Sequence, residues 1–304
     1  MGKRVTRPAP DGRGVALLLL GSFLISWSAV FVKVSHVGPS AAGFYRNLFG
    51  TIALLAVVAT QKTPLWKGWR AMGLALLAGA FFGSDIFCWH RSILYIGPGL
   101  ATIMGNFQVF VLGAVGIVAF GERTTWRFFL AVPLAVLGLF LLVGTDWRNA
   151  GGHYRAGVIF GVLTALNYSG YLLTMRASQR ATRKLNGSAN LMWVSSVAAA
   201  ILLLVSLVEG ESLRIPDAQT WSALLAYGIV CQAVGWVVIS RALPRVDASR
   251  VGLLLLLQPM LTFIWDIVLF GRPTTFTEGA GAVLALTAIY LGNMRRVPRQ
   301  ETMA

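Results

Sequence analysis

The sequence predicts an all-α integral membrane protein with ten transmembrane helices, arranged as two inverted five-helix repeats. The chain has 304 residues, of which 56% are hydrophobic and only 12% are charged. Soluble domains carry about a quarter charged residues, so this composition is typical of a membrane protein. The apolar residues also come in long blocks, and one short segment is written nearly twice, 150 positions apart.

The apolar blocks predict the individual spans. A helix needs about 20 mostly apolar residues to cross the hydrocarbon layer. The blocks that meet this length are 14–34, 40–60, 71–94, 98–120, 125–144, 154–177, 187–209, 219–242, 247–270 and 276–294. The first block follows basic residues but lacks a small-residue cleavage site, so we predict a retained span and not a signal peptide. The short connections leave no room for a soluble catalytic domain.

The net charge of +15 predicts the orientation of the chain. If the N-terminus is cytoplasmic, most Lys and Arg residues flank the cytoplasmic ends of the spans, as the positive-inside rule expects. The outer ends then hold only Lys33, Arg91, Arg148, Arg155, Arg214 and Arg272. Residues 1–13 and 295–304 are therefore predicted to be cytoplasmic tails. The basic residues bracket spans and form no single face, so we expect no nucleic-acid partner.

The repeated segment reads AFGERTTW at 119–126 and LFGRPTTF at 269–276. The same offset relates Arg91 to Arg241 and Gln108 to Gln258, which indicates an internal duplication. It divides the chain into repeats at 14–144 and 154–294. Each holds five spans, an odd number, so the second must enter the membrane from the opposite side. Inverted repeats of this kind are typical of secondary transporters, whose substrate site lies near the midplane between the halves.

Three segments resemble a known family. VFVLGAVGIVAFGERTTWRFFLAVPLAVLGLFLLVG at 109–144 is similar to the fourth and fifth helices of an EamA repeat, from the drug/metabolite transporter superfamily. ISWSAVFVK at 25–33 and GPSAAGFYRNLFG at 38–50 resemble its first two helices, and Arg46 falls at the family's Arg position. In the second repeat Gly271-Arg272-Pro273 replaces Gly-Glu-Arg. The resemblance implies a transporter, and the aromatic positions favour an amino acid exporter within the superfamily.

Asp85 is an ionisable residue at membrane depth, where such groups are costly and usually mark a pathway. It shares a helix face with Phe81 and Trp89, at i−4 and i+4. We weigh two roles for it, a proton-coupling carboxyl and a packing residue. His90, one turn from the outer end of the same span, is interpreted as a residue of the cavity or of its rim.

Aromatic stripes point to the wall of a cavity. Tyr168 and Tyr171 lie too centrally in the sixth span for an interfacial belt, and such rings can stack on an apolar or aromatic substrate. Trp27 in the first span continues the pattern, and Trp236 in the eighth follows Gln232 at i+4. Each stripe alone is better explained by packing than by a site. The three together favour a site around the repeat axis.

Polar and kinked positions complete the prediction. Gln108 and Gln258 either join helices or offer hydrogen bonds to a substrate. Pro259 predicts a kink or hinge in the ninth span. Arg46 is expected to extend toward the interface, and Asp266, near the outer end, is expected to be solvated. The predicted substrate-binding residues are Trp27, Phe82, Asp85, His90, Asn106, Gln108, Tyr168, Tyr171, Trp236 and Gln258.

We expect a multi-pass transporter of a bacterial inner membrane that exports amino acids by alternating access, with aromatic and other apolar ones favoured. Its partners would be the amino acid, membrane lipids and, as one option, coupling protons. Cys88 and Cys231 lie inside spans, so no metal or disulfide spacing is visible, and we expect no cofactor. The sequence shows neither paired carboxylates within the spans nor a nucleophile with a positioned base, so nothing in it indicates an enzyme. Drug export stays open as an alternative. A polyamine carrier should show more in-span carboxylates, and a nucleotide-sugar carrier should show a deep Lys or Arg.

Overall fold

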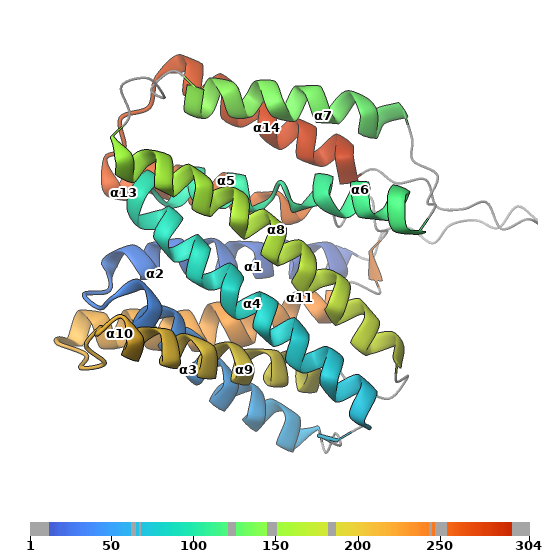
Figure 1. Ribbon diagram of the computed structural model, residues 1–304, viewed down its shortest axis with the longest axis vertical. Coiled ribbons are helices and arrows are strands. Elements are labelled where there is room, and N and C mark those ends of the chain that lie inside the picture. The colour runs from blue at the N-terminus through green and yellow to red at the C-terminus, as the bar shows by residue number, and fades with distance from the viewer. Residues whose placement is uncertain are drawn as a thin grey trace, which may run out of the picture.

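A computed structural model of the chain describes residues 12–61, 65–66, 68–120, 126–144, 151–181, 187–242, 245–246 and 254–293. The regular structure in these ranges is helical throughout (Figure 1). The first repeat contains α1 (Gly12–Ser26), α2 (Ser28–Val34), α3 (Pro39–Thr60), α4 (Trp69–Ile96), α5 (Pro98–Gly105), α6 (Gln108–Phe120), α7 (Trp126–Leu139) and the π-helix η1 (Phe140–Gly144). The second contains α8 (Gly152–Ala181), α9 (Gly187–Val208), α10 (Ala218–Ala226), the π-helix η2 (Tyr227–Gly235), α11 (Trp236–Ala242), α13 (Leu257–Phe270) and α14 (Phe276–Asn293).

These elements build ten spans. Seven helical stretches in the described ranges are long and apolar enough to cross a membrane, and three shorter apolar helices complete the set, at 126–142, 257–270 and 276–292. The ten-helix prediction is therefore confirmed. The first helix begins at Gly12, so it includes two residues that we had assigned to the N-terminal tail. Residues 1–11 and 295–304, the rest of both predicted tails, lie outside the described residues, as does residue 294 at the end of the predicted second repeat.

The helices pack in pairs that follow the repeat. Spans at the same position in each repeat lie together, as α3 with α9, α5 with α13, and α7 with α14 (Figure 1). The remaining large interfaces come in exchanged pairs: α4 on α8 corresponds to α1 on α11, and α4 on α9 corresponds to α3 on η2. The two repeats are thus interleaved, and their main interfaces lie between repeats. Any rearrangement between the two repeats must therefore shift one repeat relative to the other along these surfaces.

Small residues allow the closest of these approaches. A Cβ on Gly138 of α7 would lie 2.6 Å from the backbone nitrogen of Ala285 in α14, and one on Gly281 would meet the Gly138 carbonyl at 2.9 Å. Larger side chains would push the two helices apart. Small residues at close helix contacts are a common device of membrane proteins, because van der Waals packing must replace the hydrophobic effect there.

Two repeat-related spans are interrupted at equivalent positions. The fourth span breaks at Asn106–Phe107, between α5 and α6, and the ninth breaks at Leu256, before α13. Residues 106 and 256 are related by the repeat offset. Pro259 falls in the first turn of α13, where its missing N–H breaks no hydrogen bond within the helix. Discontinuous helices often form the sites of secondary transporters. The proposed hinge motion at Pro259 stays a prediction.

Candidate functional site

The largest buried cluster of the described residues lies between the repeats and is centred on one face of α4. Phe82, Asp85 and Trp89 follow each other at i, i+3 and i+7, and all three are buried. The cluster also contains Tyr171 of α8 and Tyr227 of η2. We call these five residues, together with Arg46, His90 and Gln232, the central cluster. It brings a carboxylate and a guanidinium among aromatic rings.

Arg46 does not reach the membrane interface, so our expectation for it was wrong. Its side chain is 5% exposed and turns into the bundle, where its Nε donates to Gln232 Oε1 at 2.9 Å and its Nη1 to Tyr227 Oη at 2.7 Å. The guanidinium carbon also lies 5.5 Å from the centre of the Phe82 ring and 5.8 Å from that of Trp89. Because specific acceptors and ring faces satisfy the guanidinium inside the protein, it has no need to extend toward water.

The π-helix η2 explains how two partners reach the same guanidinium. Tyr227 and Gln232 are five residues apart, a spacing that separates side chains widely in an α-helix. The wider i→i+5 turn of a π-helix brings such residues nearly onto one face. Gln232 Nε2 in turn donates to Ser195 Oγ of α9 at 2.9 Å, which fixes the orientation of its amide. Spans two, seven and eight therefore meet at this point.

His90 joins the same network with a defined tautomer. Its Nδ1 lies 2.8 Å from the Pro39 carbonyl oxygen, which can only accept, so Nδ1 carries the proton. Its Nε2 therefore accepts from Tyr227 Oη at 2.9 Å, and that hydroxyl accepts in turn from Arg46. His90 is fully buried and not a rim residue. The third spans of the two repeats meet here, through His90 and Tyr227.

Asp85 has no such partners. It is 6% exposed, and its Oδ1 is buried without a hydrogen bond in the described part of the chain. Arg46 is its charged neighbour, yet no nitrogen of Arg46 lies within the 4.0 Å of an ion pair. An unpartnered carboxyl group at this depth is costly, which makes Asp85 a candidate functional group, and its role in transport stays a prediction.

The predicted aromatic residues line this region. The Phe82 and Tyr171 rings are 4.9 Å apart, and Tyr168 stacks on Tyr171 at 5.6 Å. Trp27, at the break between α1 and α2, packs against the same core and lies 4.9 Å from the Trp265 ring. The structure thus brings Trp27, Phe82, Tyr168 and Tyr171 together with Asp85 and His90.

Four predicted site residues lie apart from the central cluster. Trp236 packs with two other groups of core residues, which include Leu18, Ile239 and Leu54, and its Nε1 is buried without a partner. Asn106 Nδ2 donates to the Thr102 carbonyl within its own span. Gln108 is half-buried at the start of α6, with Oε1 unpartnered, and Gln258 is half-buried in the first turn of α13. Their part in substrate binding stays a prediction.

Sequence reasoning missed four residues of the central cluster as site candidates, namely Arg46, Trp89, Tyr227 and Gln232. Trp89 and Gln232 had been noted only as helical neighbours of Asp85 and Trp236. Arg46 could have been found, because it occupies the Arg position of the EamA resemblance. Tyr227 is five residues from Gln232, so it falls outside the helical i, i+4 spacing that relates Gln232 to Trp236. No pattern in the apolar sequence around it indicates a π-helix.

Polar contacts join the repeats at one end of the bundle, where α2 ends and α3 begins; we call it the outer end. Asp266 of α13 is 1% exposed, so our expectation of a solvated carboxylate was wrong. Its carboxylate lies 3.8 Å from Lys33 Nζ and 3.5 Å from Arg272 Nη1, and accepts from the Gly99 N–H at 3.0 Å. Arg91 Nη2 also lies 2.5 Å from Glu209 Oε1.

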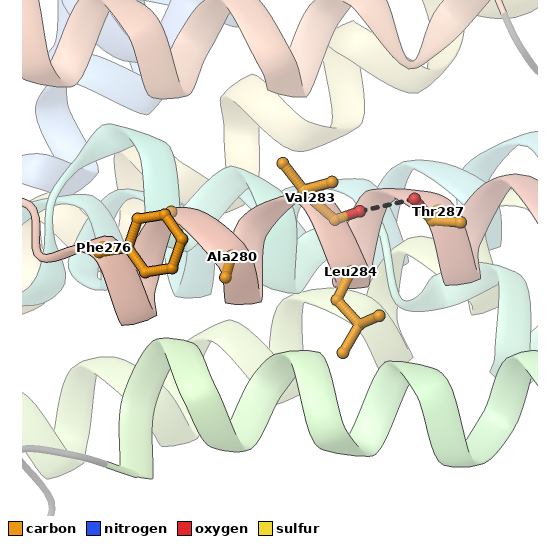
Figure 2. Close-up of a pocket in the computed structure, with 6 residues that line it drawn as sticks. Phe276, Ala280, Val283, Leu284 and Thr287 are labelled. Atoms are coloured by element: carbon orange, nitrogen blue, oxygen red, sulfur yellow. Dashed lines mark hydrogen bonds between the residues drawn. The ribbon is translucent and has the colours of Figure 1, made fainter.

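Two hollows open at the surface of the described residues. One, of about 560 Å³, lies along α14 and is lined by Phe276, Gly279, Ala280, Val283, Leu284 and Thr287 (Figure 2). The Thr287 hydroxyl donates its one hydrogen to the Val283 carbonyl at 2.7 Å, within its own helix, and the other lining residues are Gly or have apolar side chains. Val283 is 67% exposed, as expected of a lipid-facing helix. A second hollow of about 400 Å³ opens at the outer end beside His36 and Glu211.

Comparison with known proteins places the chain among transporters. The family described as "EamA-like transporter family" matches residues 12–144 and again residues 155–294. A "Probable amino-acid metabolite efflux pump" of Salmonella typhimurium is 27% identical over 286 residues, covering 91% of this chain and 93% of the relative. Its Escherichia coli K12 namesake is 24% identical over 284 residues, covering 91% and 93%. One crystal structure superimposes with a TM-score of 0.66 at 17% identity, covering 92% of this chain and 98% of the other.

Proposed function

Because the chain belongs to the EamA-like transporter family, we propose that it exports amino acids, with aromatic and other bulky neutral ones favoured. Membership of the family establishes the general function, which is that of a multi-pass membrane transporter and not of an enzyme. The substrate class is our proposal. Two relatives of this chain bear the name of amino-acid metabolite efflux pumps, and their identity to it is 27% and 24%.

The observation that supports this proposal best is the composition of the central cluster. It offers one buried carboxylate, one buried guanidinium and several rings between the two repeats. A neutral zwitterion with a large apolar side chain matches these groups in both charge and polarity. A dibasic or diacidic substrate would leave one charge unpaired inside the membrane, which is costly.

We also propose transport by alternating access. The interleaved interfaces of the repeats come in exchanged pairs, so exchanging the conformations of the two repeats yields a second state with equivalent contacts. The contacts of Asp266 and Glu209 would hold the outer end closed in the state described here. Release of the substrate to that side requires that they break.

The orientation is part of the same proposal. We place both termini in the cytoplasm, as the distribution of Lys and Arg favours, with residues 1–13 and 295–304 as tails and repeats at 14–144 and 154–294. A reporter fused to the C-terminus should then be active only in the cytoplasm. A periplasmic signal from the same fusion would overturn the orientation.

The substrate is tested by counterflow in proteoliposomes. Vesicles loaded with unlabelled amino acid are mixed with labelled phenylalanine, threonine, lysine, glutamate or spermidine, with and without a pH gradient. Phenylalanine should exchange faster than lysine, glutamate and spermidine. Preferred exchange of spermidine or glutamate would contradict the proposal, and dependence on the gradient would support proton coupling.

Export of drugs or other small metabolites is the second candidate within the family. The depth of Arg46 revives one rival in particular, since we had expected a nucleotide-sugar carrier to show a deep cation and had found none. Asp85 disfavours that rival, because a buried carboxylate beside the guanidinium repels a phosphate. Competition of phenylalanine exchange by a nucleotide sugar and by a cationic dye tests both rivals.

A further inference from the structure

We propose that Arg46 and Asp85 form a clamp for the two charges of an amino acid, the guanidinium taking the α-carboxylate and the carboxylate taking the α-ammonium. This inference rests on the proposed function and names how that site recognises its substrate. It follows from three features of the described residues: open donors on Arg46, open acceptors on Asp85, and rings on either side.

Arg46 has donors to spare. A guanidinium carries five N–H groups in a planar fork. The structure uses Nε and one N–H of Nη1 for Gln232 and Tyr227, and gives Nη2 no partner among the described residues. Both bonds go to neutral acceptors, so the positive charge itself has no carboxylate within 4.0 Å. Guanidinium and carboxylate groups match in geometry, so an incoming carboxylate fits these open donors.

Asp85 supplies the opposite charge on the same side. Arg46 lies over the Phe82 and Trp89 rings, and Asp85 stands between those two residues on the same face of α4. Its buried Oδ1 has no partner. A direct Arg46–Asp85 bond would satisfy both groups and leave nothing to recognise. Because the structure shows no such pair, the Arg46 guanidinium can still donate to an incoming carboxylate, and the Asp85 carboxylate can still accept from an incoming ammonium. One ligand that carries both charges would use both groups.

The surrounding contacts hold the clamp in place. Gln232 and Tyr227 fix the guanidinium from the second repeat, and His90 fixes the Tyr227 hydroxyl. The side chain of a bound amino acid would then lie toward Phe82, Tyr171 and Tyr168, whose rings pack in series. The clamp thus spans both repeats, and a rearrangement between them would change the position of Arg46 against its partners.

The test uses analogues that lack one charge. In proteoliposomes that exchange labelled phenylalanine, unlabelled phenylalanine should inhibit at least about tenfold better than 3-phenylpropionate, which lacks the ammonium, or phenethylamine, which lacks the carboxylate. Equal inhibition by all three, with exchange intact, would overturn the clamp and leave the proposed function standing. Failure of the protein to exchange any amino acid would instead overturn the proposed function.

Two variants then assign each charge. Asp85→Asn should reduce the preference for phenylalanine over 3-phenylpropionate to about twofold or less, and Arg46→Gln should do the same for phenylalanine over phenethylamine. General misfolding would not change one ratio and spare the other. Asp217→Asn, at an outer-end carboxylate that contacts His36, is the matched control and should keep both ratios. An Asp85→Asn protein that keeps both ratios while losing its pH dependence would assign Asp85 to proton transfer and contradict the clamp.

Discussion

Lys33 Nζ lies 3.8 Å from Asp266 Oδ1 and joins the first span of one repeat to the fourth span of the other. Asp266 also lies 3.5 Å from Arg272 and accepts from the Gly99 N–H, so one carboxylate holds four segments together at the outer end. It is 1% exposed, whereas Lys33 is 36% exposed. A buried charge with several partners can be removed only at the cost of leaving those partners unsatisfied.

The first prediction concerns this contact as a gate. Asp266→Asn should weaken the outer end and raise the share of molecules that are open there. Cys88 is buried, so it should react slowly with a reagent added from outside while the outer end is closed. In a Cys231→Ala background, its reaction with a membrane-impermeant maleimide therefore measures that opening. If the closed state loses about 1–2 kcal/mol of stability relative to the open state, Cys88 should be labelled roughly five- to thirtyfold faster.

Thr287→Val on the lipid-facing side of α14 is the control for this experiment. Its hydroxyl bonds only within its own helix, so labelling of Cys88 should match the parent protein. Equal labelling in the Asp266→Asn and control proteins would mean that the Asp266 contacts do not determine whether the outer end is closed.

The second prediction concerns Tyr227, whose hydroxyl accepts from Arg46 and donates to His90. Tyr227→Phe removes that oxygen and leaves a guanidinium N–H and the His90 Nε2 without partners. Unsatisfied buried groups cost about 1–3 kcal/mol, so the protein should unfold at lower temperature in detergent. Tyr95→Phe is the control, because the Tyr95 side chain is 37% exposed. Its free energy of unfolding should stay within about 0.5 kcal/mol of that of the parent protein. Equal melting of the two variants would contradict the bridging role.

Spans and repeats could be predicted because hydropathy and periodicity are local properties. The ten blocks and the offset of 150 require no knowledge of which helices meet. Asp85, Phe82 and Tyr171, which the structure brings together, could be named as candidates for the same reason, since charge or aromatic character inside a span is visible in the sequence.

Arg46 was misplaced because its environment depends on a distant helix. From the sequence alone, its position near the outer end of α3 is compatible with a side chain that extends to the interface. Only the contacts with Tyr227 and Gln232 show that it turns into the bundle. Those two residues converge through a π-helix, and the apolar sequence of η2 does not indicate that change of period. Asp266 was misjudged in the same way, because its partners Lys33 and Gly99 belong to the other repeat.

The third prediction concerns ring selection in the central cluster. Tyr171→Ala removes the ring that lies 4.9 Å from Phe82 and stacks on Tyr168. A stacked pair contributes about 0.5–1.5 kcal/mol, so the preference for phenylalanine over threonine in counterflow should fall about two- to tenfold. Tyr171→Phe keeps the ring, so it should keep the preference. If Tyr171→Ala also keeps it, the rings of this cluster serve packing alone.

The last prediction concerns Trp236, which tests the sequence interpretation against the structure. An α-helical spacing from Gln232 would place Trp236 beside the central cluster, whereas η2 ends at Gly235 and Trp236 packs among Leu18, Ile239 and Leu54. We therefore expect Trp236→Ala to destabilise the protein, by less than the roughly 3–5 kcal/mol of a fully buried ring because it is half-buried. Exchange of phenylalanine and of threonine should then fall by the same factor.

Trp236→Phe provides the comparison, since it keeps a ring at lower volume and should restore much of the melting temperature. The decisive measurement is the ratio of phenylalanine to threonine exchange, normalised to folded protein. A selective loss of phenylalanine exchange in folded Trp236→Ala would assign this ring to the substrate after all. It would also require that span eight rotate during transport, because in the state described here Trp236 and Tyr227 belong to different packing clusters.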